Sequence, residues 1–153
     1  MRDFEKISFE QFKKDVCDDR DLYDSFRLPQ RDSLASVGYD FVLLKDVEIK
    51  PGEIVKLPTG IKSYFDKDEA LLLIVRSSTG FKYNIRLVNQ VGVIDSDYYN
   101  NKDNEGHLFT KVQNEGNETY KFKAGESLVQ GMFVKYLTTK SDNVLGIERT
   151  SFY

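Results

Sequence analysis

The stretch Leu71-Leu72-Leu73-Ile74-Val75 decides the class of fold, and the polar run Arg76-Ser77-Ser78-Thr79-Gly80 follows it directly. An apolar run this short, with turn residues on both sides, favours a strand that is buried on both faces over a helix. Strands of that kind lie in the interior of a sheet. We therefore expect residues 71–75 to form a central strand.

Short extended segments separated by turn residues surround this strand. The turn signals before it are Pro51-Gly52, Pro58-Thr59-Gly60 and Asp66-Lys67-Asp68. Val47 and Ile49 alternate with polar neighbours, as in a strand with one wet face. Further strands are expected at residues 86–88, 91–94, 108–112, 119–122 and 132–137. So many short strands in a chain of 153 residues predict an all-β fold, either a distorted β-barrel or a jelly roll.

The beginning of the chain carries a helix signal. Ser8-Phe9-Glu10-Gln11 has the capping-box pattern, and Phe9, Phe12 and Val16 lie on one helical face. The acidic stretch at residues 18–24 is expected to end this helix. We therefore expect one short N-terminal helix in an extension of residues 1–27, docked on a β-domain of residues 28–153.

Composition limits the classes of function. The chain has 40% hydrophobic and 31% charged residues, and no apolar run approaches the roughly 20 residues that cross a bilayer. The net charge of -3 argues against a broad nucleic-acid footprint, which needs clustered cations. Residues 1–6 do not resemble a secretory signal. We expect a cytoplasmic protein with neither a nucleic-acid nor a membrane partner.

Soft metal ligands are scarce. Cys17 is the one cysteine and His107 the one histidine, which excludes an internal disulfide. The pair is also too small a ligand set for structural zinc.

Two polar stretches interrupt the strand pattern. Residues 76–80 offer a guanidinium, three hydroxyl groups and a glycine turn, which suit phosphate oxygens, although such clusters also occur in ordinary turns. Asp95 follows an apolar strand directly, with Asp97 and Tyr98 close behind. A carboxylate at a strand end suits a general base or a metal contact, and it equally suits an Asx turn.

The order and spacing of these stretches resemble the motifs of the trimeric dUTPase family. The resemblance extends from Leu28 onward, and the N-terminal segment is similar to an extension in some bacterial and phage members. The stretches that match the first four motifs are Val37-Gly38-Tyr39-Asp40-Phe41, Arg76-Ser77-Ser78, Gly92 to Tyr98, and Gly125-Glu126-Ser127-Leu128-Val129-Gln130. The resemblance implies a dUTP diphosphatase that hydrolyses dUTP to dUMP and pyrophosphate, in a homotrimer with active sites between subunits.

The resemblance also implies roles for particular residues. Asp95 would be catalytic, contacting the 3′-hydroxyl and orienting the water that attacks the α-phosphorus in line. Tyr98 would pack beneath the sugar and exclude a 2′-hydroxyl. Mg²⁺ would be held mainly by the phosphates, with Asp40 reaching it through water. The substrate-binding residues would be Arg76, Ser77, Ser78, Asn89, Gly92, Ile94, Tyr98, Gln130, Arg149 and Phe152.

The chain departs from the family pattern at three places. Ser127 stands where the fourth motif usually has arginine or lysine, and the loop at residues 100–106 is longer than usual. Only Arg149-Thr150-Ser151-Phe152-Tyr153 remains of the fifth motif, without its Gly-Ser-Thr stretch. Two alternatives stay open: a dCTP deaminase-like enzyme on the same fold, and a nucleotide-binding regulatory homologue with little turnover. The motif Asp95-Ser96-Asp97-Tyr98 favours the diphosphatase.

Overall fold

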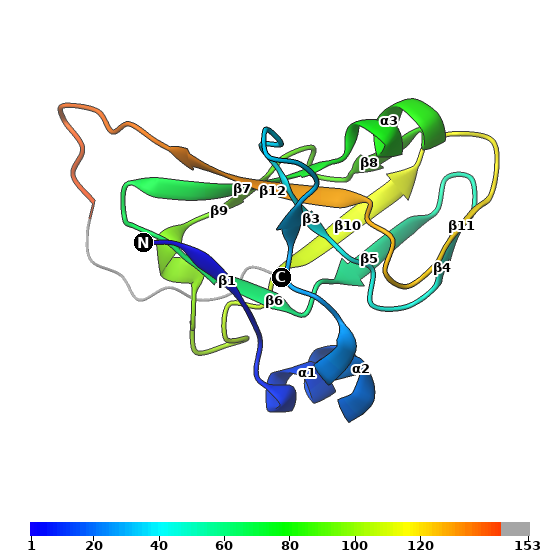
Figure 1. Ribbon diagram of the computed structural model, residues 1–153. Helices are drawn as coiled ribbons and strands as arrows, with labels where there is room; N and C mark the ends of the chain where they lie inside the picture. Colours follow the sequence, from blue (N-terminus) through cyan, green and yellow to red (C-terminus); the bar gives the residue numbers. More distant parts are fainter. Residues whose placement is uncertain (145–153) are drawn as a thin grey trace.

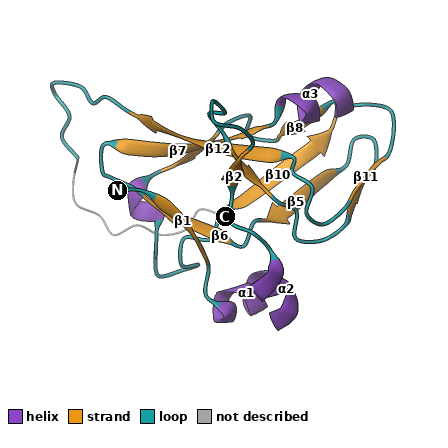
Figure 2. Cartoon of the chain, in the orientation of Figure 1, coloured by secondary structure: helices purple, strands orange, loops and turns teal. Residues whose placement is uncertain are grey.

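The computed structural model describes residues 1–144, which form a β-domain with short helices at its edges (Figures 1 and 2). Within these residues the strands form four sheets that do not close into a barrel, so the all-β prediction is confirmed as a jelly-roll-like arrangement. The strands are β1 (Asp3–Lys6), β2 (Gln30–Arg31), β3 (Tyr39–Phe41), β4 (Val47–Ile49), β5 (Ile54–Pro58), β6 (Ile61–Tyr64), β7 (Glu69–Val75), β8 (Ile85–Leu87), β9 (Gly92–Ile94), β10 (Phe109–Asn114), β11 (Tyr120–Phe122) and β12 (Val129–Lys135). The helices are α1 (Phe9–Asp15), α2 (Arg20–Ser25), α3 (Ser77–Tyr83) and the 3-10 helix η1 (Ser96–Tyr98).

The largest sheet has the strand order β2-β3-β12-β7-β9, with β7 between β12 and β9. The predicted central strand at residues 71–75 is therefore confirmed. Its side chains alternate between two environments: Leu71 and Leu73 are buried, whereas Leu72 and Ile74 are only half-buried. Burial on both faces was expected, and in the single chain only one face is fully covered.

The half-covered side, which we call the outer face, runs across several strands. Met132 of β12 and Val93 of β9 lie opposite Leu72. Gln130 lies opposite both Ile74 and Asp40. Because residues directly opposite each other project from the same side of a sheet, an apolar region continues into a polar one on this face.

The hydrophobic core lies between the inner face of the large sheet and the smaller sheets. These smaller sheets are β5-β10-β8, β4-β11 and β1-β6, all with antiparallel pairing. Their fully buried side chains include Ile49, Ile61, Ile85, Leu87 and Val112. Apolar burial on this scale is the main stabilising contribution to a domain of this size.

The N-terminal segment contains more structure than one helix. Ser8 caps α1 as the sequence indicates, but the acidic stretch forms a second helix, α2, because the Asp19 side chain accepts from the Leu22 N–H at 3.0 Å. The expectation of a single short helix was therefore wrong. The segment also supplies β1, which extends β6. Figure 1 places α1 and α2 together below the β1–β6 pair.

Helix α3 was also missed, because residues 76–80 were interpreted as a turn. Serine, threonine and glycine are weak helix formers, so propensity alone does not predict it. Tertiary contacts decide the outcome: Thr79 is buried, and its hydroxyl donates to the Leu128 carbonyl at 2.8 Å. Asn84 ends the helix in the left-handed conformation, with φ of 55°.

In the part of the chain that the structure describes, no helix has the length and apolar character needed to span a membrane.

Candidate functional site

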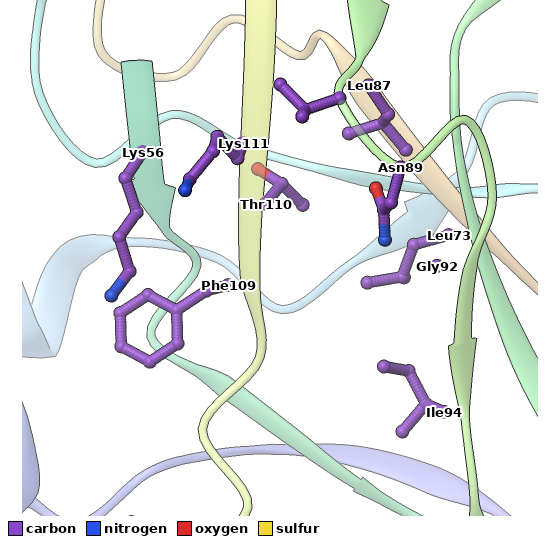
Figure 3. A pocket seen from close by; sticks show the side chains of 10 residues that line it. Lys56, Leu73, Leu87, Asn89, Gly92, Ile94, Phe109, Thr110 and Lys111 are labelled. Carbon is purple, nitrogen blue, oxygen red and sulfur yellow. The ribbon is translucent and has the colours of Figure 1, made fainter. Parts of the chain in front are cut away.

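The first candidate pocket lies between the tight turn that joins β8 to β9 and strands β5 and β10. We call it the hairpin pocket after this reversal of the chain, although β8 pairs with β10 and β9 with β7. Its volume is about 230 Å³. Figure 3 shows side chains of β7, β8, β9 and the β8–β9 turn on one side of this space and those of β10 and β5 on the other. The lining residues are Lys56, Leu73, Leu87, Val88, Asn89, Gly92, Ile94, Phe109, Thr110 and Lys111. Three of them, Asn89, Gly92 and Ile94, were predicted as site residues.

Backbone hydrogen bonds hold the turn between β8 and β9 in place. Gln90 has a φ of 65° and donates its N–H to the Leu87 carbonyl, while the Val91 N–H donates to the Asn89 carbonyl at 2.7 Å. Gly92 allows a close approach to β7, since a β-carbon there would lie 3.2 Å from the Leu73 β-carbon. The pocket therefore combines an apolar floor with main-chain and amide groups, as suits a flat heterocycle with polar edges.

Strands β5 and β10 add groups that the sequence did not reveal. The Lys56 ammonium lies 4.3 Å from the centroid of the Phe109 ring, and Lys111 supplies a second cation at the pocket. Lys56 lies between Val55 and Leu57, and Lys111 lies between Thr110 and Val112, as is common for solvent-facing lysines in strands. No sequence signal separates them from ordinary surface residues.

The second candidate site, the outer groove, has a volume of about 490 Å³ and lies at the polar end of the outer face. It is lined by Asp32, Ser36, Val37, Gly38, Asp40, Arg76, Ser77, Ser78, Gln130 and Met132. The structure therefore brings together the predicted residues Asp40, Arg76, Ser77, Ser78 and Gln130. Asp32 is an addition that no motif pointed to.

An ion pair organises the groove. Arg76 Nε lies 3.3 Å from Asp40 Oδ1, and Asp40 is 8% exposed. Burial raises the pKa of the Asp40 carboxyl above its ordinary value, and Arg76 opposes that shift. The Gln130 side chain donates to the Val75 carbonyl at 3.4 Å, next to Arg76 in the chain. A guanidinium, an amide and two serine hydroxyls suit the oxygens of an anion such as phosphate.

Among residues 1–144, no group of three or more histidine, cysteine, aspartate or glutamate side chains is placed to hold a metal ion. Asp32 and Asp40 do line the same groove. Two carboxylates suit contact with the water shell of a hard cation whose other ligands come from a phosphate-bearing substrate.

The two sites use opposite faces of the large sheet. Leu73, Gly92 and Ile94 line the hairpin pocket from the inner face, whereas Gln130 and Asp40 line the groove from the outer face. The two sets of lining residues have no member in common. One chain by itself therefore does not present both sites to one small ligand.

Asp95 and Tyr98 closely follow the pocket residue Ile94 in the sequence, but neither of them lines the hairpin pocket. Asp95 is exposed at the end of β9, where it precedes η1. Tyr98 is 4% exposed, and its hydroxyl donates to the His107 carbonyl at 3.0 Å. Arg149 and Phe152 lie outside the described residues, so their predicted roles stay predictions.

Comparisons with known proteins agree on one family. A family model described as dUTPase matches residues 24–153. The deoxyuridine 5'-triphosphate nucleotidohydrolase of Lactococcus lactis is 44% identical over 115 residues, which cover 75% of this chain and 77% of that protein. The crystal structure of dUTPase from Streptococcus mutans aligns with a TM-score of 0.72 and 40% identity, covering 90% of this chain and 98% of that chain. A mutant dUTPase from phage phi11 of S. aureus, in which a structural Mg(II) ion is coordinated, has a TM-score of 0.68 at 18% identity and covers 97% of this chain and 99% of that chain. That last similarity concerns the fold alone.

Proposed function

The chain belongs to the dUTPase family and is a hydrolase of dUTP, and we propose that it cleaves dUTP to dUMP and pyrophosphate at a site shared between subunits. The observation that carries the shared site is the position of the hairpin pocket and the outer groove on opposite faces of one sheet. A nucleoside bound in the pocket of one subunit would extend its phosphates into the groove of another.

The hairpin pocket is the proposed nucleoside site. Uracil presents a donor at N3 between two carbonyl acceptors, a pattern that main-chain groups of the β8–β9 turn and the Asn89 amide are suited to match. Cytosine presents a different pattern, and it would leave buried polar groups unpaired at a cost of about 1–3 kcal/mol each. Tyr98 stays the residue proposed to exclude a 2′-hydroxyl.

The outer groove is the proposed phosphate site. Arg76, Ser77, Ser78 and Gln130 would hold the phosphate oxygens by charge-assisted hydrogen bonds. Holding the triphosphate in a fixed conformation places the α-phosphorus for in-line attack and lowers the entropic part of the barrier.

Asp95 is the proposed base. Its carboxylate would accept a proton from a water molecule while that oxygen forms a bond to the α-phosphorus. The bond between the α-phosphorus and the bridging oxygen breaks at the same time, and pyrophosphate leaves with the electron pair. An exposed carboxylate at the end of β9 can reach a ligand that extends out of the pocket.

Mg²⁺ is the proposed cofactor, and the outer groove offers it two carboxylates. Asp40 and Asp32 would contact its water shell, because the described residues supply no cage of three ligands. When bound, the ion would neutralise negative charge on the phosphates. The phage phi11 dUTPase mutant of the same fold, in which a structural Mg(II) ion is coordinated, supports this proposal.

A homotrimer is the proposed assembly. Leu72, Ile74, Met132 and Val93 form an apolar region on the outer face, and Val93 is 61% exposed. An exposed apolar surface next to a binding groove is typical of a subunit interface. The cytoplasm is the proposed location, since a charged nucleotide does not cross a bilayer unaided.

One assay tests the reaction and its rivals. Pyrophosphate release is measured from dUTP, dCTP, dTTP and UTP, with and without Mg²⁺, together with ammonia release from dCTP. We expect Mg²⁺-dependent release from dUTP alone. Ammonia from dCTP would establish the deaminase, and tight dUTP binding without turnover would establish the regulatory homologue.

A further inference from the structure

Residues 99–107, which we call the 99–107 loop, directly follow Tyr98 and fold back onto it. The Asn104 amide donates to the Tyr98 hydroxyl at 2.7 Å, and that hydroxyl donates to the His107 carbonyl. The Asn101 amide donates to the Tyr98 carbonyl at 2.8 Å. Gly106 has a φ of 88°, and a β-carbon there would lie 2.9 Å from the Tyr98 carbonyl oxygen. The position of the Tyr98 ring therefore depends on the conformation of this loop.

The N-terminal segment in turn holds the 99–107 loop at its C-terminal end. Glu105 accepts hydrogen bonds from the backbone N–H of Ser8 at 2.6 Å and from the Ser8 hydroxyl at 2.7 Å. Lys62 of β6 donates to the same carboxylate at 3.0 Å. Burial alone would raise the pKa of Glu105, but the bonds from Ser8 and Lys62 hold it below its ordinary value.

Two more contacts connect other parts of the segment to the loop. The Tyr99 hydroxyl donates to Glu5 of β1 at 2.5 Å, which raises the pKa of Tyr99 to about 12. His107 Nδ1 lies 2.7 Å from the Asp15 carboxylate at the end of α1, and Nε2 accepts from the Gly60 N–H at 2.9 Å. Because Nε2 is an acceptor, the proton lies on Nδ1 and is donated to Asp15.

The segment also has contacts with the domain that do not involve this loop. β1 pairs with β6 along its length, and Arg2 forms an ion pair with the buried carboxylate of Glu69. The additional polar contacts from β1, from the cap of α1 and from its last residue converge on one loop. That convergence indicates a function in the loop itself.

We propose that the N-terminal segment is a positioning element, in which Glu5, Ser8 and Asp15 fix the 99–107 loop and thereby the Tyr98 ring that discriminates deoxyribose from ribose. This inference rests on the proposed function, in which Tyr98 borders the sugar. The three residues do not touch the substrate. Their loss would let the loop and the ring move, which admits a 2′-hydroxyl.

The test is the ratio of kcat/KM for dUTP to kcat/KM for UTP. This ratio does not depend on how much of a preparation is folded, so a loss of stability alone leaves it unchanged. In the triple variant Ser8→Ala, Asp15→Ala, Tyr99→Phe, we expect the ratio to fall about tenfold. This is the order of magnitude for losing the contacts by which a neighbouring element positions a binding-site residue. Tyr99→Phe alone removes one hydroxyl and should shift the ratio in the same direction by a smaller factor.

Matched controls separate positioning from attachment. Arg2→Gln removes a contact between the segment and the domain that does not involve the loop, and its ratio should equal that of the wild type. Asp15→Asn keeps an oxygen that accepts from His107 Nδ1. As a single substitution it should keep the wild-type ratio, whereas Asp15→Ala as a single substitution should lower it. Amide hydrogen exchange at residues 100–106 should be faster in the triple variant than in Arg2→Gln.

The outcomes are distinct. An unchanged ratio in the triple variant, or equal exchange rates in the triple variant and the control, overturns the inference. If the wild-type chain releases no pyrophosphate from dUTP, the proposed function has failed, and hydrogen exchange alone then decides whether the segment holds the loop.

Discussion

Arg76 and Asp40 form an ion pair across the polar end of the outer face, with Nε 3.3 Å from Oδ1. Each residue fixes the other: Asp40 orients the guanidinium toward the groove, and Arg76 stabilises the charge of a nearly buried carboxylate. A cation that is already held in place loses little freedom when it binds phosphate.

Replacing Arg76 by glutamine should lower kcat/KM for dUTP about 100-fold, because charge-assisted bonds to the phosphates are lost. Steady-state kinetics measures the change. Arg86→Gln is the matched control, since Arg86 is also a partly exposed arginine paired with a carboxylate, Glu115. Equal effects of the two substitutions would contradict a phosphate-binding role for Arg76.

Replacing Asp95 by asparagine should reduce kcat by about 100-fold or more while dUTP binding is mostly retained, because the side chain keeps its size but no longer accepts a proton. Single-turnover kinetics and calorimetric titration with a non-hydrolysable dUTP analogue measure the two properties. Asp97 is a nearby exposed carboxylate, and the control variant Asp97→Asn should lose far less of its kcat. Near-normal turnover in the Asp95→Asn variant would rule out Asp95 as the general base.

Gly38 faces the Gln130 side chain, and a β-carbon at position 38 would lie 1.9 Å from Gln130 Oε1. Gln130 Cδ and Cβ would lie 2.7 Å and 3.0 Å from that β-carbon, so Gly38→Ala should displace the whole Gln130 side chain. Because this side chain is flexible, the change in unfolding free energy should stay within about 1 kcal/mol. Because Gln130 lines the groove, KM for dUTP should rise while the melting temperature stays nearly the same. An unchanged KM would show that Gln130 does not bind the phosphates.

Val93→Glu should disrupt the proposed trimer, because a charge would be buried in the apolar region of the outer face. Light scattering should show the wild type at three times the 17.7 kDa chain mass and the variant mainly at the mass of one chain. Ile54→Glu, at an exposed apolar residue of β5, is the control and should stay trimeric. A wild type that is fully active as a monomer would refute the shared site.

Stability should fall at mildly acidic pH because of His107, which is completely buried. Burial lowers the pKa of His107 below its ordinary value of 6.5, although Asp15 and Glu105 oppose the shift and Lys56 adds to it. The folded state therefore binds fewer protons here than the unfolded chain, so this contribution is complete above pH 6.5 and declines as the pH falls below that value.

Urea denaturation measures this effect. Between about pH 7.5 and about pH 5.5, the free energy of unfolding should fall through this one group. His107→Gln should reduce that pH dependence, whatever its effect on stability at neutral pH. The same slope in both proteins would assign the decline to other groups.

The sequence by itself determined the class of fold and predicted some of the residues that line the two candidate sites. Residues 71–75 predict a central strand because a continuous apolar run is stable only where neighbouring strands cover it. Asn89, Gly92 and Ile94 lie within a few residues of one another, and so do Arg76, Ser77 and Ser78. Local motifs of this kind are visible in sequence because chain connectivity keeps their members together.

Only the tertiary structure decided how these pieces combine. Thr79 and its bond to Leu128 form a helix where propensity indicates a turn, because a long-range contact outweighs weak local preferences. Asp32 reaches the groove, and Lys56 reaches the hairpin pocket, from strands and loops that are distant in sequence. The alternation of side chains along β7 and its partners places the two sites on opposite faces of one sheet. The contacts of Ser8 and Asp15 with the 99–107 loop likewise exist only after the chain has folded, because no local signal links residues so far apart.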